Sequence, residues 1–339
     1  MTPSIFRVVL VFNVLAILLL LYNYFNLQQE LHQLRRTIGL THAGISSRDL
    51  ALETNQFHES QESYVVVYNR VPKTGSTSFV GLAYDLCTKN KYNVLHVNIS
   101  KNMHILSLAD QVRFVTNITS WNEKKPALYH GHMSFVDFKR FGKPSPLYIN
   151  IVRKPIDRLV SYYYFLRYGD NYRPHLVRKK QGDKMIFDEC VKLGKPECDP
   201  VNLWLQVPFF CGHAAECWIP GNQWALEQAK RNLIDHYFVV GVTEEMEDFV
   251  AVLEAALPRL FHGALQLYRT GQKSHLRKTN QKVLPSSETL QTIQESPIWQ
   301  LENEFYNFAQ ENFQAVKQRL LINSKEKGQQ FFYEKIRPK

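Results

Sequence analysis

The residues best suited to chemistry form one polar stretch, residues 70–78, which reads Arg-Val-Pro-Lys-Thr-Gly-Ser-Thr-Ser. A Val-rich apolar run, residues 64–68, precedes it, and apolar residues at helical spacing follow it. A helix that begins here would present backbone N–H groups and the positive end of its dipole to an anion. Lys73 would add a full positive charge. The stretch therefore predicts a phosphate cradle between a strand and a helix, with an ordinary structural turn as the alternative.

Two further polar clusters also follow apolar segments that predict strands. His130 and His132 flank one glycine at the end of one such segment, and Arg153 follows residues 147–152. Short strands that alternate with helical segments indicate an α/β domain with a parallel sheet, whose functional loops lie at the carboxyl ends of the strands. We therefore expect the three clusters at one edge of a three-layer α/β domain that spans residues 64–339.

The cradle does not contain the pattern G-x-x-x-x-G-K-[ST], so an ATP or GTP P-loop is not indicated. This also removes the usual reason to expect magnesium. The other apolar and periodic segments predict scaffold elements. These are strands at residues 92–97, 128–130 and 237–242, and helices at residues 106–114, 156–166, 226–234, 244–257 and 299–320.

Several segments resemble sulfotransferases that use the donor 3′-phosphoadenylyl sulfate (PAPS). Residues 70–78 resemble their 5′-phosphosulfate loop, and Arg153 with Ser161 resembles their 3′-phosphate site. Within that superfamily the chain is similar to heparan sulfate 2-O-sulfotransferases over residues 64–339. The similar segments are YNRVPKT, STSF, AYDLC, YHGH, RLVSYYYFLR, WLQ, PFFCGH, LYRTG, KSHLRKT and FFYEKI.

The resemblance implies that the chain transfers sulfate from PAPS to the 2-hydroxyl of iduronic acid, and less often of glucuronic acid, in heparan sulfate. Transfer to an alcohol needs a base, and an imidazole with a pKa of about 6.5 suits that role. By resemblance, His132 is the general base and His130 a positioning or secondary base. Lys73 then stabilises the charge that builds on the leaving phosphate. No metal is expected.

The resemblance also implies two sets of binding residues. The donor-binding residues are Arg70, Lys73, Thr74, Gly75, Ser76, Thr77, Ser78, Arg153 and Ser161. The acceptor-binding residues are Arg70, Tyr84, His96, Arg173, Arg178, Arg277 and Lys335. Two positions depart from the family pattern. Lys154 stands where an acidic residue is usual, which could alter a local ion pair, and Gly81 stands where related sequences can have an asparagine that bonds the acceptor.

Two basic stretches are expected beside these sites. One is a run after the third helix, which by its composition would be a solvated face. Its members are Arg167, Arg173, Arg178, Lys179 and Lys180, of which the resemblance implies that Arg173 and Arg178 meet the acceptor. The other, residues 268–279, resembles a loop that closes over the nucleotide.

The net charge of +10 points to a polyanionic partner, and the amino end indicates the compartment. Residues 8–25 carry no formal charge and are long enough to span a bilayer. They predict a type II signal-anchor, with residues 1–7 cytoplasmic, residues 26–63 a lumenal stem with a short coiled-coil-like helix, and the catalytic domain lumenal. A cleaved signal peptide is the alternative. This placement disfavours nucleic acid, and the resemblance implies the Golgi membrane and a homotrimer.

Five cysteines fit an oxidising lumen. Two close pairs favour local disulfides, although the sequence does not fix the connectivity, and Cys87 would be a buried free thiol. Zinc held by Cys211, His213 and Cys217 is the alternative. The predicted disulfides are Cys190–Cys198 and Cys211–Cys217. The predicted glycosylation sites, both N-x-[ST] sequons, are Asn98 and Asn117.

Three other functions stay open from the sequence. A uronyl 2-O-sulfotransferase acting on dermatan or chondroitin sulfate keeps the chemistry and changes the acceptor. A non-catalytic glycan-binding protein of the same fold would be indicated by loss of Lys73 or of the histidine pair, and all three residues are present. A nucleotide kinase is the weakest alternative, because the glycines of a P-loop are missing.

Overall fold

The computed structural model describes residues 64–98, 103–170, 173–271 and 281–322, all within one structural unit, Ser60–Lys339. Several predictions fall on other residues. These are the cytoplasmic end, the signal-anchor, the stem, Arg277, Lys335 and most of the 268–279 loop. Among the described residues, no helix has both the length and the apolar character to cross a bilayer.

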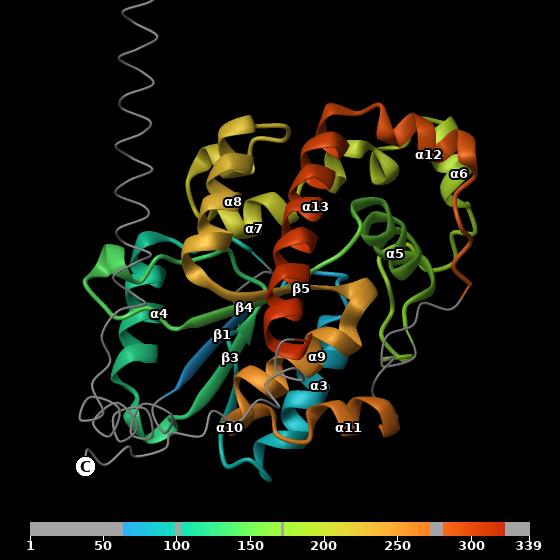
Figure 1. Ribbon diagram of the computed structural model, residues 1–339. Helices are drawn as coiled ribbons and strands as arrows, with labels where there is room; N and C mark the ends of the chain where they lie inside the picture. The colour runs from blue at the N-terminus through green and yellow to red at the C-terminus, as the bar shows by residue number, and fades with distance from the viewer. Residues whose placement is uncertain (1–63, 99–102, 171–172, 272–280, 323–339) are drawn as a thin grey trace, which may run out of the picture. The chain divides into compact units, whose positions relative to one another are not determined.

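Five strands form one parallel sheet, which confirms the predicted α/β class (Figure 1). The strands are β1 (Val65–Asn69), β2 (Asn93–His96), β3 (Ala127–Gly131), β4 (Leu147–Val152) and β5 (Tyr237–Val242). Their order is β2-β3-β1-β4-β5, so β1 and β4 are neighbours. After β1 the chain goes on to β2 at one edge of the sheet, and after β4 it goes on to β5 at the other edge. A crevice outside the carboxyl ends of such a pair is the usual ligand site of open α/β sheets.

The helices that lie close to predicted segments are α3 (Ser76–Cys87), α4 (Leu108–Ser120), α5 (Pro155–Tyr168), α8 (Gln223–His236), α9 (Met246–Ala256) and α13 (Pro297–Lys317). The sequence did not predict α6 (Phe187–Lys192), α7 (Gln206–Cys211), α10 (Pro258–Phe261), α11 (Ala264–Thr270) or α12 (Ser287–Gln294). Pro155 begins α5, where its fixed φ suits a first turn. The helix predicted at 106–114 begins later, because Oγ of Ser107 caps it by accepting from the Asp110 N–H, and it continues to Ser120.

One face of the sheet packs against α3, α9 and α10. Tyr68 of β1 contacts Phe79 of α3, with 5.2 Å between ring centroids. Phe79 in turn contacts Phe249 of α9 and Phe261 of α10. All four rings are buried. This aromatic cluster forms the first layer of packing and holds α3 beneath the carboxyl end of β1.

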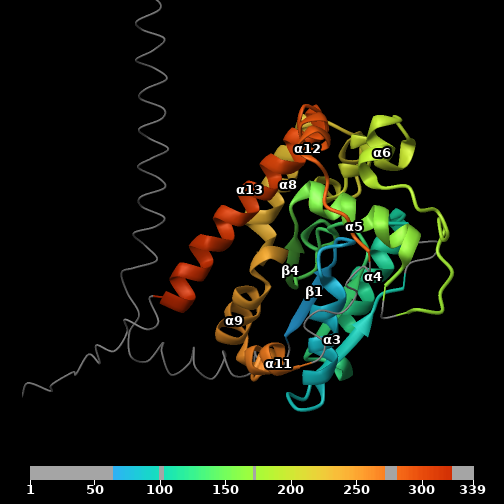
Figure 2. The ribbon, with the colours of Figure 1, turned by 90° about the vertical axis from the view of Figure 1, so that its right-hand side faces the viewer.

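The other face packs against α4, α7 and α8. Tyr148 of β4 pairs in register with Val67, so it points away from the face of Tyr68. It contacts Tyr237 of β5, and Phe210 of α7 lies 4.6 Å from Tyr237 between ring centroids. The sheet is therefore the middle of three layers, and α13 runs beside α8 and α9 along the molecule (Figure 2).

Both predicted disulfides are present, Cys190–Cys198 and Cys211–Cys217. The zinc alternative is wrong, because this second pair uses the two thiolates on which it depended. The described residues also contain no group of three or more His, Cys, Asp or Glu side chains that could hold a metal ion. Cys87 is free, as expected, but it is half-buried rather than buried.

Candidate active site

The segment after β1 turns sharply before α3 begins. Lys73 has a φ of +69° and Gly75 a φ of +76°, both in the left-handed region that disfavours side chains. The positive φ at Gly75 favours glycine there, and an added Cβ would also lie 2.9 Å from Cε of Met246, which would have to shift. No side chain among the residues that the structure describes caps the N-terminus of α3, whose N–H groups are suited to bind an anion. The loop has the form that the sequence predicted for a phosphate cradle.

Two contacts tie this loop to the carboxyl ends of β4 and β5. Nη1 of Arg153 donates to the carbonyl oxygen of Lys73 at 3.3 Å. Oγ1 of Thr243 lies 3.0 Å from the carbonyl oxygens of both Thr74 and Val152. Thr243 follows β5 directly and was not singled out from the sequence. The loops after β1, β4 and β5 are thus held together at the crevice.

A buried glutamine fixes the backbone of Arg153. Oε1 of Gln206 accepts from the Arg153 N–H at 2.8 Å, and its Nε2 donates to the Arg153 carbonyl at 2.9 Å. The same Nε2 lies 3.3 Å from Oε2 of Glu302, whose pKa is raised by burial. Both polar backbone atoms of Arg153 are therefore satisfied from within the protein. Its guanidinium is left to contact residues 70–78, the predicted donor loop, and a ligand.

Positive charge collects around Arg153. Nζ of Lys282 lies 4.0 Å from Oδ1 of Asp157, and the pKa of Lys282 is lowered by burial and by the charge of Arg153. Ser161 is buried on α5, and Nε of Arg153 is buried with no hydrogen-bond partner among the described residues. Two cations, one carboxylate and an unpaired N–H fit a phosphate group. The sequence reasoning missed Lys282, although it follows the basic 268–279 segment.

His132 lies just after β3 and is half-buried. Its Nδ1 is 2.8 Å from the carbonyl oxygen of Arg70. A carbonyl oxygen can only accept, so Nδ1 carries the hydrogen, and Nε2 is the basic nitrogen of the neutral ring. Nδ1 of His104 donates to the His132 carbonyl at 3.1 Å. His104 thereby supports the residue that was predicted to be the base, and no sequence pattern had pointed to it.

His130 occupies a different environment from His132. Its ring stacks on His96 with 4.9 Å between centroids, and its Nε2 lies 3.0 Å from the Tyr84 hydroxyl. Burial and, to a smaller extent, the charge of Arg70 lower the pKa of His130 to about 3. The ring therefore stays neutral near neutral pH and is a weak base. Nη2 of Arg70 lies 3.5 Å from Nε2 of His96, so three of the predicted acceptor residues meet around His130.

Phe165 on α5 brings the donor loop and the predicted acceptor segment together. Nζ of Lys73 lies 4.1 Å from its ring centroid, and Cζ of Arg178 lies 4.3 Å from the same centroid. Asp170, which is buried, accepts from the backbone N–H of Arg173 at 3.0 Å and lies 3.5 Å from Nη2 of Arg178. Arginine side chains suited to a polyanion therefore begin where the phosphate cradle ends.

Comparison with known proteins agrees with this arrangement. Residues 60–309 match the family described as the sulfotransferase family. The chain is 61% identical over 287 residues to human heparan sulfate 2-O-sulfotransferase 1, across 83% of this chain and 80% of that protein. It is 59% identical over 290 residues to heparin sulfate O-sulfotransferase of Drosophila melanogaster, across 85% and 83% of the two chains. This chain belongs to the heparan sulfate 2-O-sulfotransferase family.

Many of the residues that were predicted from resemblance to this family lie near the carboxyl ends of β1, β2, β3 and β4, while Tyr84 and Ser161 lie on α3 and α5 and Arg173 and Arg178 follow α5. Arg277 and Lys335 lie outside the described residues. The departure at Lys154 leaves an exposed side chain, while its backbone N–H donates to Oε1 of Glu244 at 3.2 Å. Gly81 is half-buried on α3. Both sequon asparagines, Asn98 and Asn117, are exposed.

Proposed function

We propose that this protein transfers the sulfuryl group of PAPS to the 2-hydroxyl of iduronic acid, and less often of glucuronic acid, in heparan sulfate. The observation that carries the proposal is the hydrogen bond from His132 to the Arg70 carbonyl. This bond directs the basic Nε2 of His132 away from the backbone. His132 follows β3 and Lys73 follows β1, and these two parallel strands are neighbours, so both residues lie at the same end of the sheet. Two relatives that are 61% identical over 83% of this chain are named heparan sulfate 2-O-sulfotransferase 1, and the Drosophila relative is named heparin sulfate O-sulfotransferase.

The donor fits the two anion sites. The 5′-phosphosulfate would bind Lys73, the backbone of residues 74–77 and the hydroxyls of the cradle, and the 3′-phosphate would bind Arg153, Ser161 and Lys282. The N–H groups at the N-terminus of α3 support the first assignment, and the surplus of positive charge around Arg153 supports the second.

The chemistry follows from three side chains. Nε2 of His132 takes the proton of the acceptor hydroxyl as its oxygen attacks sulfur, and the bond from sulfur to the bridging phosphate oxygen breaks. The ammonium of Lys73 stabilises the negative charge that develops on that oxygen. His130 stays neutral and holds the Tyr84 hydroxyl, so its role is to position acceptor-side groups. No covalent enzyme intermediate is needed.

The acceptor would bind along the basic groups next to the cradle. Arg70, Tyr84 and His96 lie around His130, and Arg173 and Arg178 lie around Asp170. Arg277 and Lys335 complete the proposed acceptor set. Guanidinium groups pair with carboxylates and sulfates through two parallel hydrogen bonds, which suits a chain that carries both.

The remaining assignments complete the proposal. The protein is a single-pass type II Golgi membrane protein with a lumenal catalytic domain, glycosylated at Asn98 and Asn117 and assembled as a homotrimer. The exposure of both asparagines and the two disulfides support a lumenal location.

An acceptor assay tests the function. The full-length chain is incubated with 35S-labelled PAPS and, separately, with desulfated N-resulfated heparan sulfate, dermatan and chondroitin. Disaccharide analysis then locates the label. We expect label on the 2-hydroxyl of uronic acid in heparan sulfate. Label in dermatan or chondroitin alone would assign the protein to the other uronyl acceptors, and binding of glycan without any transfer would make it a non-catalytic binder.

A further inference from the structure

The segment between α5 and α6, residues 169–186, carries two arginines of the proposed acceptor site. Its described part forms turns rather than a helix or a strand. Among the described residues, two backbone bonds join it to α5, from the Gly169 N–H to the Phe165 carbonyl and from the Lys180 N–H to the Leu166 carbonyl, both at 3.0 Å. A segment with so little regular structure takes its position largely from side-chain contacts. The placement of Arg173 and Arg178 therefore depends on what holds this segment.

A buried arginine in the last turn of α5 provides such a contact. The side chain of Arg167 is 0% exposed, although the sequence placed it in a solvated basic run. Its Nη2 lies 2.9 Å from Oδ2 of Asp183 and 2.6 Å from Oε1 of Glu197, and its Cζ lies 3.6 Å from the ring centroid of Tyr163. A buried guanidinium is stable only when it is paired. Arg167 therefore holds both carboxylates in place.

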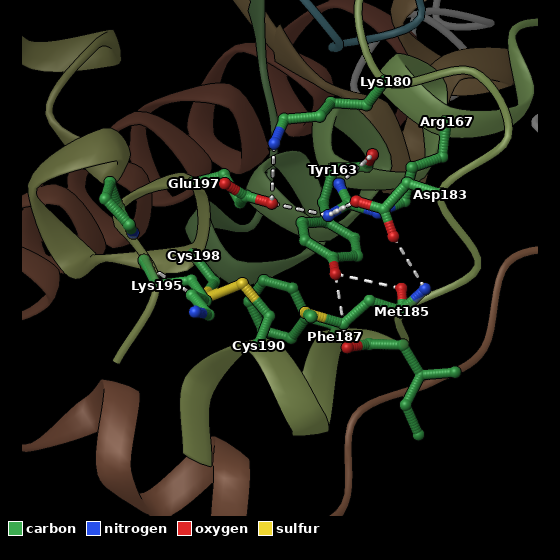
Figure 3. A network of polar contacts seen from close by, with 12 residues as sticks. Tyr163, Arg167, Lys180, Asp183, Met185, Phe187, Cys190, Lys195, Glu197 and Cys198 are labelled. Carbon is green, nitrogen blue, oxygen red and sulfur yellow. Dashed lines mark hydrogen bonds and ion pairs between the residues drawn. A yellow bond between two sulfur atoms is a disulfide. The ribbon is translucent and has the colours of Figure 1, made fainter. Parts of the chain in front are cut away.

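The contacts of Arg167 join three parts of the chain (Figure 3). Asp183 belongs to residues 169–186, which we call the acceptor segment. Glu197 belongs to the short 3-10 helix Pro196–Cys198. Lys180, again in the acceptor segment, places Nζ 3.6 Å from the same oxygen of Glu197. Two cations thus face two carboxylates in a balanced cluster. We call Arg167, Lys180, Asp183 and Glu197 the Arg167 clamp.

Two further features make the clamp rigid. The buried disulfide Cys190–Cys198 joins α6 to the residue next to Glu197, so it limits where that carboxylate can move. The hydroxyl of Tyr163, whose ring stacks on Arg167, donates to the Met185 carbonyl at 3.0 Å. The end of the acceptor segment is thereby fixed to α5 beside the guanidinium.

We propose that Arg167 is a positioning residue for acceptor binding, and that the Arg167 clamp holds residues 169–186 so that Arg173 and Arg178 meet the glycan. This rests on the proposed function, because it takes these two arginines to bind the acceptor. The donor loop has separate anchors in Thr243 and Arg153. The clamp therefore sets affinity for the acceptor and leaves affinity for the donor nearly unchanged.

The test compares full-length variants. Arg167→Met keeps the volume and removes the charge, while Asp183 and Glu197, whose side chains are 30% and 21% exposed, can then be solvated. We expect the KM for heparan sulfate to rise about tenfold or more. Arg167→Lys should recover only part of this loss, since an ammonium cannot span both carboxylates as a planar fork does. Replacing both Cys190 and Cys198 with serine should raise the same KM by a smaller factor.

Two further measurements separate positioning from general stabilisation. The Kd for 3′-phosphoadenosine 5′-phosphate and the kcat at saturating acceptor should stay close to wild type, while amide hydrogen exchange should rise in residues 173–186. The control is Glu304→Ala, which removes an ion pair with Lys230 between α13 and α8. It should change none of these quantities.

Several outcomes would overturn the proposal. An unchanged acceptor KM in Arg167→Met would do so, as would faster exchange in residues 173–186 without any change in KM. Equal losses of donor and acceptor affinity would make Arg167 a general stabiliser of the fold. A wild-type protein that sulfates no heparan acceptor would instead refute the proposed function, while the exchange comparison would still report whether the clamp holds the segment.

Discussion

Replacing His104 with leucine should slow catalysis without weakening donor binding. Nδ1 of His104 donates to the carbonyl of His132, and the backbone carbonyl of His104 accepts from the Ser134 N–H at 3.0 Å. These two bonds join the chain before α4 to the segment that carries the proposed base. Burial lowers the pKa of His104, so the ring is neutral near neutral pH and its Nδ1–H tautomer is fixed by the carbonyl it faces.

The magnitude follows from the bond that is lost. Leucine fills space beside Phe209 and Trp218, whose rings lie 4.8 Å and 6.1 Å from the His104 ring, but it cannot donate to the His132 carbonyl. Leaving a part-buried acceptor unpaired costs about 1–3 kcal/mol. If His132 is misplaced in the transition state, that cost raises the activation free energy, and kcat should fall roughly 10- to 100-fold. Affinity for 3′-phosphoadenosine 5′-phosphate should not change, because no donor anchor contacts His104.

Asparagine at the same position provides the matched variant. Its Nδ2 can occupy the place of the histidine Nδ1 and donate to the His132 carbonyl, but it gives up the aromatic packing that leucine partly keeps. We therefore expect kcat and the melting temperature to rank the two variants in opposite orders. His104→Asn should have the higher kcat and the lower melting temperature, and His104→Leu the reverse. A kcat that follows the melting temperature in both variants would refute a positioning role and leave His104 as a packing residue.

Three other predictions follow from the site. His132→Ala should abolish turnover while nearly normal binding of 3′-phosphoadenosine 5′-phosphate is kept in calorimetry, and near-normal turnover would remove His132 as the base. Lys73→Ala should lower both kcat and donor affinity, and unchanged kinetics would exclude its assigned role. Burial lowers the pKa of His213 from 6.5 to about 4, so its protonation opposes folding. Its contribution to the free energy of unfolding should be complete above about pH 6.5 and fall by up to about 3 kcal/mol as the pH drops to 4. His213→Asn should flatten that slope in denaturation curves, and an unchanged slope would assign the acid sensitivity elsewhere.

The strands and the three polar clusters could be predicted because local patterns encode them. Val-rich runs with polar ends predict buried parallel strands, and the turn after β1 carries its own signature in Lys73 and Gly75. The order of the strands could not be predicted from local patterns. The strand next to β1 is β3, which lies far from it in the sequence, and β2, which comes between them in the chain, lies at the edge.

Three residues that hold the site were missed for one physical reason. His104, Gln206 and Thr243 act on backbone carbonyls and N–H groups, which every residue has. A contact between a side chain and a backbone group cannot be predicted from the spacing of residue types in the sequence. Arg167 was misjudged for a related reason, because its partners Asp183 and Glu197 lie in later turns and only the folded chain brings them to it.

In the site segments, strand ends carry the chemistry, and the buried Gln206 and the half-buried Thr243 and His104 fix the backbone beside them. Gln206 holds Arg153, Thr243 holds the donor loop, and His104 holds the backbone of His132. The bond from His104 to His132 is separate from the bonds of Gln206 and Thr243, which together hold the loops after β1, β4 and β5. Changes in these supporting residues should therefore separate donor affinity, catalytic rate and acceptor affinity from one another, whereas a single cooperative support would lose all three together. Measuring all three quantities in His104→Leu and Arg167→Met decides between these two arrangements.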